Sequence, residues 1–335
     1  MMKWIPVALA LLLSACSSTP QKTYYQLPAL GSPAQVSGST TSRQLWLEHV
    51  SVADYLAQSG VALDDITAVC LACAGPVGEG DFRFTNNHWV IKREQFCREL
   101  GLTHLLLIND FTSMAWAIAR LDPADSVQVR DGIALPTRPR LVIGPGTGLG
   151  LASLVPSGKD RWIVLPSEGG HVDLPINTQR EFDIWKILKR QFGNHVSAER
   201  VVSGSGLVNL YHASCELDGR TAALHSAADI CELALKGDPY ADAVLEQFFI
   251  WLARVAGNAA LTLGALGGVY IAGGILPRFV ERFQSGAFAH AFADKGKTSS
   301  AYLKDIPAWL VTAEYPGLFG AGVALDQTIA EARQV

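Results

Sequence analysis

Short apolar runs alternate with amphipathic stretches through the second part of the chain. The runs are four or five residues long and are bounded by glycine or polar residues, which is typical of buried strands. The predicted strands span residues 140–143, 151–155, 161–165, 268–272 and 308–312. Apolar positions spaced three and four apart predict helices over residues 181–192, 241–263 and 277–284. This part therefore has three strands followed by alternating helices and strands.

The earlier part of the chain repeats only the end of this pattern. Strands are predicted over residues 66–74 and 104–108, and helices over residues 93–100 and 111–121. A meander of three strands followed by helix, strand, helix and strand is typical of one ribonuclease-H-like half. Three strands with a glycine-rich hairpin are therefore expected before residue 66, but the pattern there does not contain them. We predict an α/β protein with a duplicated ribonuclease-H-like fold whose first half lacks its opening three strands.

The N-terminus has the pattern of a secretory signal. Lys3 supplies a positive charge, and residues 4–13 form an apolar stretch that is too short to span a bilayer. The sequence LSAC at residues 13–16 resembles the lipobox of bacterial lipoproteins. This resemblance implies lipidation of Cys16, and Ser17 after it resembles the outer-membrane sorting type. The alternative is an apolar leader that arose by chance.

The segment after the leader predicts a tether. Residues 17–42 are rich in Ser, Thr, Pro, Gly and Gln, as flexible linkers are. Residues 44–52 alternate apolar and polar positions like a half-buried strand. Residues 1–61 together resemble the start of the ABC-type transport auxiliary lipoproteins of the paraquat-inducible system. We therefore expect a signal peptide over residues 1–16, and a tether with a lipoprotein-like fragment over residues 17–61.

Composition narrows the possible function classes. Hydrophobic residues make up 49% of the chain and the net charge is −4, which allows a large core but gives no basic surface for nucleic acid. Cys70 and Cys73 have the spacing of a CxxC motif but lie in an apolar strand, where positions i and i+3 face opposite sides. We interpret both as core residues rather than as a disulfide or metal site, and the cysteine pattern as that of a reduced compartment.

Two segments at strand ends are candidates for catalysis and phosphate binding. The turn GPGTGLG at residues 144–150 joins two strands. Its glycines let backbone N–H groups approach a phosphate closely, and Thr147 adds a hydroxyl. Asn109 and Asp110 follow a strand at the sheet edge where ligands collect, and the Asp110 carboxylate can accept a proton from an attacking hydroxyl. The alternatives are a tight structural hairpin for the turn and a helix cap for Asp110.

Three further segments carry polar groups or paired glycines. Glu168 and His171 flank two glycines after a predicted strand, where a carboxylate and an imidazole can hydrogen-bond vicinal hydroxyls. Glu199 is another carboxylate near a predicted helix start. Gly273 and Gly274 end a buried strand, and such a turn can pack against a base or a ribose. The alternatives are a surface turn, a capping box at Glu199 and close strand–helix packing.

The order of these segments is more specific than any one of them. INDF, GPGTGLG, PSEGGHVD, HVSAERVVSGSGLVNLY, GGVYIAGGILPRF, DKG and IPAWLV follow one another along the chain. This series resembles the proteobacterial ATP-dependent glucokinases from about Leu63 to Leu325. The resemblance implies an actin-like ATPase fold and transfer of the ATP γ-phosphoryl group to the 6-hydroxyl of glucose, with Mg²⁺ present. It also implies a homodimer.

The resemblance assigns a role to each matching residue. Asp110 is expected to be the general base. The residues expected to bind the sugar are Asn109, Asp110, Glu168, His171 and Glu199. The residues expected to bind ATP are Gly146, Thr147, Gly148, Gly273 and Gly274. Ser167 is a departure, because the family usually has Gly before the Glu at this position.

One motif of the family does not occur in these 335 residues. The family opens with the loop Gly-Asp-x-Gly-Gly-Thr-Asn, which cradles phosphate and whose Asp helps to place Mg²⁺. Asp54 is the only Asp before Asp64, and no glycine pair accompanies it, so we assign no metal ligand. Besides the leader and the tether, we expect a truncated small domain over residues 62–138 and a large domain over residues 139–335. A fusion of two gene fragments explains this combination, and phosphoryl transfer is expected to be impaired.

Three functions compete on these patterns. The first is a glucokinase that is complete on its sugar side and weakened on its nucleotide side. The second is a membrane-anchored lipoprotein of an envelope transport system, and the third is a sugar-binding module without catalysis. The expected compartments also conflict, because the leader predicts an outer-membrane lipoprotein facing the periplasm, whereas ATP-dependent kinase chemistry belongs in the cytoplasm.

Overall fold

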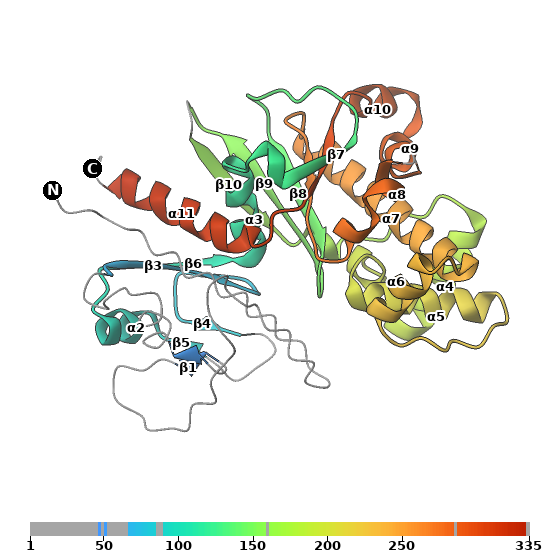
Figure 1. Cartoon of the computed structure of the whole chain (residues 1–335), viewed down its shortest axis with the longest axis horizontal. Coiled ribbons are helices and arrows are strands. Elements are labelled where there is room, and N and C mark those ends of the chain that lie inside the picture. The colour runs from blue at the N-terminus through green and yellow to red at the C-terminus, as the bar shows by residue number, and fades with distance from the viewer. Residues whose placement is uncertain are drawn as a thin grey trace. The chain divides into compact units, whose positions relative to one another are not determined.

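The computed structural model describes residues 66–84, 90–158, 161–284 and 287–332, together with the backbone of four residues near position 50 (Figure 1). The chain divides into two compact units, which are Met1–Ser113 with Tyr315–Val335, and Met114–Glu314. The predicted signal peptide and Cys16 lie outside the described residues. Within the described part, no helix is both long enough and apolar enough to cross a bilayer.

The second unit is built on a six-stranded mixed sheet (Figure 1). Its strands are β7 (Ser126–Arg130), β8 (Arg140–Pro145), β9 (Leu149–Pro156), β10 (Trp162–Ser167), β11 (Val269–Ile271) and β12 (Ala308–Val311). The spatial order is β10-β9-β8-β11-β12-β7. β8, β9 and β10 form an antiparallel meander, and β11 lies parallel to both β8 and β12. The predicted ribonuclease-H-like order is therefore confirmed for this part of the chain.

Burial along the strands explains their places in this sheet. Leu141, Val142 and Ile143 of β8 are fully buried, because a central strand is covered on both faces. The edge strand β10 instead exposes Ile163 and Leu165. The remaining edge strand, β7, pairs antiparallel with β12 and is one that the apolar pattern did not predict.

Several helices complete the second unit. They are α4 (Gln179–Phe192), α5 (Gly204–Leu217), α6 (Ala227–Leu235), α7 (Pro239–Leu263), α8 (Val280–Gln284), α9 (Ala287–Ala293) and α10 (Gly296–Leu303). Local sequence sets their ends: Thr178 forms a capping box with Glu181 at the start of α4, and Asp238 caps α7 just before Pro239. Gly264 ends α7 in the left-handed conformation, with φ 61°.

A buried ion pair joins two of these helices. Arg254 Nη1 of α7 donates to Glu181 Oε1 of α4 at 2.5 Å, and Gln247 Nε2 donates to the same oxygen at 3.0 Å. Burial alone would raise the pKa of Glu181. The hydrogen bonds from Arg254, the Asn177 N–H and Gln247 outweigh burial and hold that pKa below its ordinary value. The Glu181 carboxylate is therefore satisfied within a core that includes Trp251, whereas the buried Arg254 Nε has no hydrogen-bond partner.

The first unit contains a parallel pair of strands and a short antiparallel pair. β3 (Ala68–Cys73) runs parallel to β6 (His104–Asn109). The other elements are β4 (Phe82–Arg83), β5 (Val90–Ile91), α2 (Arg93–Leu100), the start of α3 (Asp110–Ala119) and α11 (Pro316–Ala332). Cys70 and Cys73 lie inside β3, and burial raises the pKa of each thiol to about 12. Both are core residues, as the apolar run predicted.

Both units contain a pair of parallel neighbouring strands. β3 and β6 are parallel neighbours, as β11 and β12 are in the second unit. β11 also pairs with β8 on its other edge, whereas no strand among the described residues pairs with the other edge of β3. The described part of the first unit thus holds the later strands of such a half, as expected from the sequence.

Two expectations differ from the structure. Residues 44–52 were expected to form one half-buried strand, but the described residues there form two short antiparallel strands, β1 (Trp46–Leu47) and β2 (Val50–Ser51). The second difference concerns the division of the chain. The expected boundary lay at residues 138 and 139, whereas the contacts group residues 114–138 with the second unit and the C-terminal residues with the first.

Candidate active site

The glycine turn forms the tip of the β8–β9 hairpin. Gly144 pairs with Gly150 and Pro145 with Leu149, so only three residues close the hairpin. The Gly146 N–H donates to the Gly148 carbonyl at 2.8 Å within this turn. The Gly146 backbone and Thr147 are exposed, and no atom lies nearer than 4.0 Å to a Cβ built on Gly146. The turn is therefore a tight hairpin in which the Gly146 N–H is already paired, while Thr147 and the Gly146 backbone are exposed.

Glu199 is bonded to the base of this turn. It lies in a short 3-10 helix, η4 (Ala198–Arg200), and its Oε2 accepts a hydrogen bond from the Leu149 N–H at 2.9 Å. A Cβ on Gly148 would lie 2.3 Å from the same oxygen, so a side chain there would have to displace the Glu199 carboxylate. Ser197, at the N-cap of η4, makes no side-chain capping bond, so the capping-box alternative is wrong.

Glu168 and His171 lie next to Glu199. They flank the 3-10 turn η3 (Gly169–His171) that follows β10. His171 Nε2 lies 3.7 Å from Glu168 Oε2, and His171 Nδ1 lies 4.0 Å from Glu199 Oε1. The side chains of Glu168, His171 and Glu199 are 71%, 59% and 28% exposed, so all three can meet a ligand. We refer to Glu168, His171 and Glu199 as the acid–imidazole cluster.

Small residues let η3 pack directly on β9. A Cβ on Gly170 would lie 2.1 Å from the Leu149 carbonyl oxygen, and one on Gly169 would lie 3.0 Å from the Leu151 side chain. Ser167 donates its hydroxyl to the Leu151 carbonyl at 3.0 Å. This hydrogen bond explains how Ser is accommodated where the family usually has Gly.

The two glycines after β11 have different surroundings. Gly273 has φ 127°, and a Cβ there would lie 2.4 Å from the Pro145 carbonyl oxygen. Gly274 has nothing within 4 Å of its Cβ position. Gly273 therefore serves close packing of β11 against β8, rather than the strand–helix packing named as the alternative, while space beside Gly274 is open to a ligand.

Asn109 and Asp110 lie in the first unit, where β6 ends and α3 begins. Asn109 Oδ1 accepts from the Phe111 N–H at 2.8 Å and the Thr112 N–H at 3.2 Å, so Asn109 caps α3. Asn109 Nδ2 donates to the Gly75 carbonyl at 3.2 Å, which leaves its second N–H for other partners. Asp110 is thus the first residue of α3 rather than its cap, although its Oδ1 also accepts from the Phe111 N–H at 2.9 Å.

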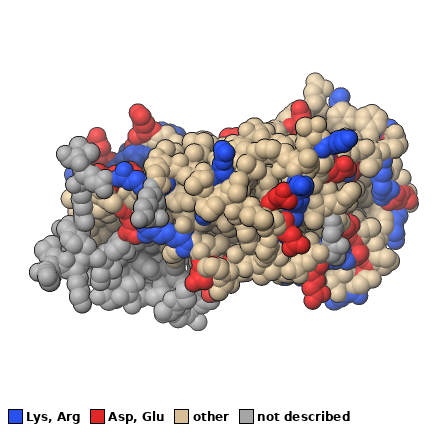
Figure 2. Space-filling view, turned by 90° about the horizontal axis from the view of Figure 1, so that it is seen from above, with Lys and Arg blue, Asp and Glu red and all other residues tan. Residues whose placement is uncertain are grey.

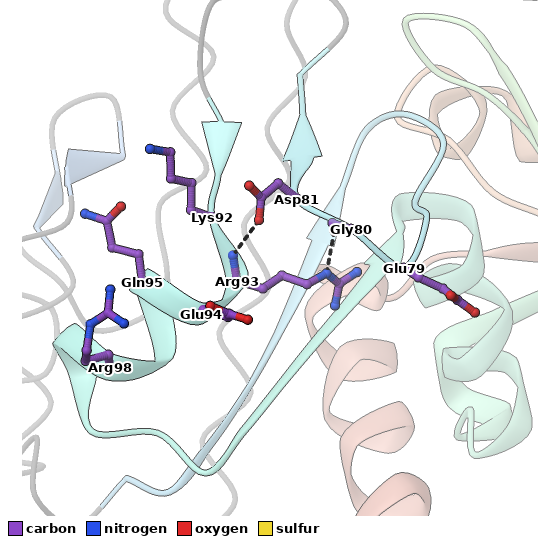
Figure 3. Close-up of a pocket in the computed structure, with 8 residues that line it drawn as sticks. All are labelled: Glu79, Gly80, Asp81, Lys92, Arg93, Glu94, Gln95 and Arg98. Atoms are coloured by element: carbon purple, nitrogen blue, oxygen red, sulfur yellow. Dashed lines mark hydrogen bonds between the residues drawn. The ribbon is translucent and has the colours of Figure 1, made fainter.

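A cavity of about 570 Å³ lies elsewhere in the first unit, and Figure 3 shows its lining. It is lined by Glu79, Gly80, Asp81, Lys92, Arg93, Glu94, Gln95 and Arg98. Arg93 donates to the Gly80 and Gly78 carbonyls at 2.7 Å, and its backbone N–H donates to Asp81. The Arg93 guanidinium therefore holds a loop, and none of the predicted site residues borders this cavity.

Charge on the surface is mixed in sign. On the face drawn in Figure 2, basic and acidic side chains are interspersed. Among the residues that the structure describes, no three His, Cys, Asp or Glu side chains are grouped as metal ligands would be.

Sequence reasoning missed several contacts around the turn. The Gly204 N–H at the start of α5 donates to the Gly146 carbonyl at 2.8 Å. His195 contacts both Asp173 and the backbone of His171. His195 stands in the motif HVSAER, but nothing in a linear pattern indicates which backbone group it touches.

Comparison of the sequence with known proteins finds matches to one family. A family model described as glucokinase matches residues 40–328. Glucokinase from Pseudomonas paraeruginosa (strain DSM 24068 / PA7) is 64% identical over 285 residues, which cover 85% of this chain and 84% of that protein. Glucokinase from Chromohalobacter salexigens is 43% identical over 271 residues, covering 81% of this chain and 83% of that protein.

Solved structures agree with this assignment. A glucokinase from an Antarctic psychrotroph has a TM-score of 0.70 and 39% identity, covering 77% of this chain and 80% of its own. A glucokinase from Balamuthia mandrillaris, in complex with glucose, has a TM-score of 0.66 at 23% identity and supports the fold alone, with 77% of each chain covered. The family match begins at residue 40, earlier than Leu63, so it includes residues that were expected to be lipoprotein-like. On these grounds the chain belongs to the glucokinase family.

Proposed function

We propose that this chain is an ATP-dependent glucokinase that transfers the γ-phosphoryl group of ATP to the 6-hydroxyl of glucose. The observation that carries this proposal is the position of Glu199. One carboxylate oxygen accepts from the Leu149 N–H at the base of the glycine turn, and the other is directed toward His171. The Glu199 side chain therefore lies between His171, which can bind sugar hydroxyls, and the glycine turn, which can bind phosphate.

The acid–imidazole cluster is proposed to bind the sugar. Two carboxylates and an imidazole offer several acceptors and a donor over a short distance, which suits the adjacent hydroxyls of a pyranose. The second N–H of Asn109 is proposed as a further donor, because the other polar atoms of that amide already have partners.

Asp110 is proposed as the general base. Its carboxylate would accept the proton of the 6-hydroxyl while that oxygen bonds to the γ-phosphorus and the bond to the ADP oxygen breaks. Phosphoryl transfer depends mainly on positioning and charge stabilisation, so the base contributes alongside the groups that hold the sugar.

The nucleotide is proposed to bind at the glycine turn and beside Gly274. Gly146, Thr147 and Gly148 would lie against the phosphate oxygens, with the Thr147 hydroxyl and the turn N–H groups other than that of Gly146 as donors, and the open space at Gly274 suits the adenosine. Mg²⁺ normally accompanies ATP, but we assign no residue of this chain as its ligand and derive no step through the ion.

Turnover is expected to be far below that of a relative with a complete nucleotide site. The string Gly-Asp-x-Gly-Gly-Thr-Asn does not occur in this sequence. Loss of one oriented donor to a transition state commonly costs roughly 10²–10³ in rate, and a whole loop supplies several. We therefore expect sugar binding to survive better than phosphoryl transfer.

Calorimetry with glucose in the absence of nucleotide, followed by a coupled glucose/ATP assay, tests the proposal. We expect glucose binding by the full chain, loss of that binding in Glu168→Gln combined with His171→Asn, and slow but measurable turnover. Glu232→Gln is the control, because Glu232 is an exposed carboxylate that pairs with Lys236. Failure of the unchanged chain to bind glucose would contradict the proposal, and binding without any turnover would indicate the non-catalytic module instead.

Three finer proposals concern the leader and assembly. We propose that Cys16 is lipidated, that this lipid anchors the chain to a membrane, and that the kinase body forms a homodimer. Their support is the sequence LSAC at residues 13–16 and the family resemblance. Incorporation of labelled palmitate that disappears in Cys16→Ser tests the anchor, and sedimentation equilibrium of the chain tests the dimer; a monomer at micromolar concentration would exclude it.

A further inference from the structure

His195 links the two segments that carry the acid–imidazole cluster. Its Nδ1 lies 3.1 Å from Asp173 Oδ1, and its Nε2 lies 2.8 Å from the backbone carbonyl oxygen of His171. We propose that His195 is a positioning residue for sugar binding, which holds the turn that carries Glu168 and His171 in place through both of its ring nitrogens. This inference rests on the proposed glucose site and adds to it a residue outside the cluster.

The two partners of His195 are both acceptors. A backbone carbonyl and an ionised carboxylate cannot donate, so each contact requires an N–H on the imidazole. A neutral imidazole has one N–H and can satisfy only one partner, whereas the imidazolium satisfies both. Replacement of the ring by a methyl group therefore removes both contacts, whereas Gln, which carries an amide N–H, can keep one of them.

The backbone around His195 explains why this matters for the cluster. The Ala198 N–H donates to the Val172 carbonyl at 2.8 Å, and the Leu174 N–H donates to the Val196 carbonyl at 3.1 Å. This short antiparallel pairing fixes the segment before Glu199 against the segment after His171. The His195 ring extends the pairing to the carbonyl of His171 itself, beyond the last backbone bond. A weaker bond there would allow the His171 ring to move relative to Glu199.

Several titratable groups surround this linkage and must be separated from it. Asp173 faces His195 directly, while the His171 ring contacts Glu168 and Glu199. Because the contacts of His171 with Glu168 and Glu199 remain possible in any His195 variant, the difference in affinity between a variant and the unchanged chain isolates the contribution of His195.

The experiment measures glucose affinity of the full chain by calorimetry. We expect His195→Ala, which removes both contacts, to bind glucose roughly 3- to 10-fold more weakly than the unchanged chain, which corresponds to one hydrogen bond. His195→Gln, which keeps an N–H donor, should recover part of that affinity. Asp173→Asn should weaken binding less than His195→Ala, because it leaves the bond to the His171 carbonyl.

A matched control is available in His212. Its Nε2 also lies 2.7 Å from a backbone carbonyl oxygen, that of Leu224, but it does not touch the cluster. His212→Ala should therefore keep the glucose affinity of the unchanged chain. If His195→Ala binds glucose as tightly as the unchanged chain, or if His195→Gln recovers none of the lost affinity, the inference is overturned while the proposed function stands. If the unchanged chain does not bind glucose, both are overturned.

Discussion

At Gly148, the carboxylate of Glu199 occupies the space where a side chain would lie. The Cβ position of Gly148 is 2.3 Å from Glu199 Oε2, which is shorter than any real contact of a Cβ atom. The same oxygen accepts from the Leu149 N–H, so the turn and the carboxylate restrain each other. Gly146, two residues earlier in the turn, has no atom nearer than 4.0 Å to its Cβ position.

Gly148→Ala and Gly146→Ala therefore form a matched pair. We expect Gly148→Ala to displace the Glu199 carboxylate and to weaken glucose binding by roughly 10-fold, because a hydrogen-bonded charged group worth about 1.5–3 kcal/mol is disturbed. Gly146→Ala should leave glucose affinity nearly unchanged. Calorimetric titration of both variants with glucose checks this. Equal affinities in the two variants would show that Glu199 does not depend on Gly148.

The sequence was enough to select the candidate site residues, but it did not show which of them contact one another. Glu168, His171 and Glu199 were found from the order of motifs, and the structure brings them together in one cluster. The bond from Glu199 to the Leu149 N–H connects segments 50 residues apart, and no periodicity encodes such a contact. The alternative for Asp110 was a helix cap. The cap of α3 is in fact the preceding residue, Asn109.

At the scale of elements, the β8–β11 pair depends on a glycine at the end of β11. The two strands are parallel, with Val269 opposite Leu141 and Ile271 opposite Ile143. Gly273 continues this approach, and its left-handed φ of 127° is rarely adopted by other residues. The next glycine, Gly274, is under neither constraint.

Substitution of Gly273 and Gly274 by Ala should show which of the two glycines the fold requires. Gly273→Ala combines a strained φ with a Cβ 2.4 Å from the Pro145 carbonyl oxygen, so we expect a loss of about 2–4 kcal/mol in the free energy of unfolding. Gly274→Ala should stay within about 0.5 kcal/mol of the unchanged chain. Urea unfolding followed by circular dichroism measures both. A Gly273→Ala protein as stable as Gly274→Ala would mean that β11 can move away from β8 at little cost.

Most strands were predictable because apolar runs of this length have few other uses. β8, β9, β10, β11 and β12 all fall within two residues of their predicted bounds. β7 was missed because SVQVR alternates at a sheet edge and has no continuous apolar run. Residues 44–52 have the same alternation, yet the described backbone turns back within them, because alternation alone does not fix where a strand ends.

At the scale of the whole molecule, each unit has its own hydrophobic core. The core of the second unit includes Trp251, Phe248 and Phe249, all fully buried. The core of the first unit is a smaller cluster around Leu71 and Phe96. Since the stability of a core grows with the apolar area that it buries, the two units are expected to open at different free energies.

Hydrogen exchange can compare the two units through equivalent strands. β11 is hydrogen-bonded to β8 on one edge and to β12 on the other, whereas β3 pairs with β6 and with no other described strand. Successive N–H groups of a strand point to opposite edges, so part of the β3 amides lack a described strand partner. We expect amides of β3 to exchange at least about 10-fold faster than those of β11. Strand β6, which like β3 has one described neighbour, should exchange like β3, and β12, which pairs with both β11 and β7, should exchange like β11. Equal protection of β3 and β11 would mean instead that the two units unfold as one cooperative body.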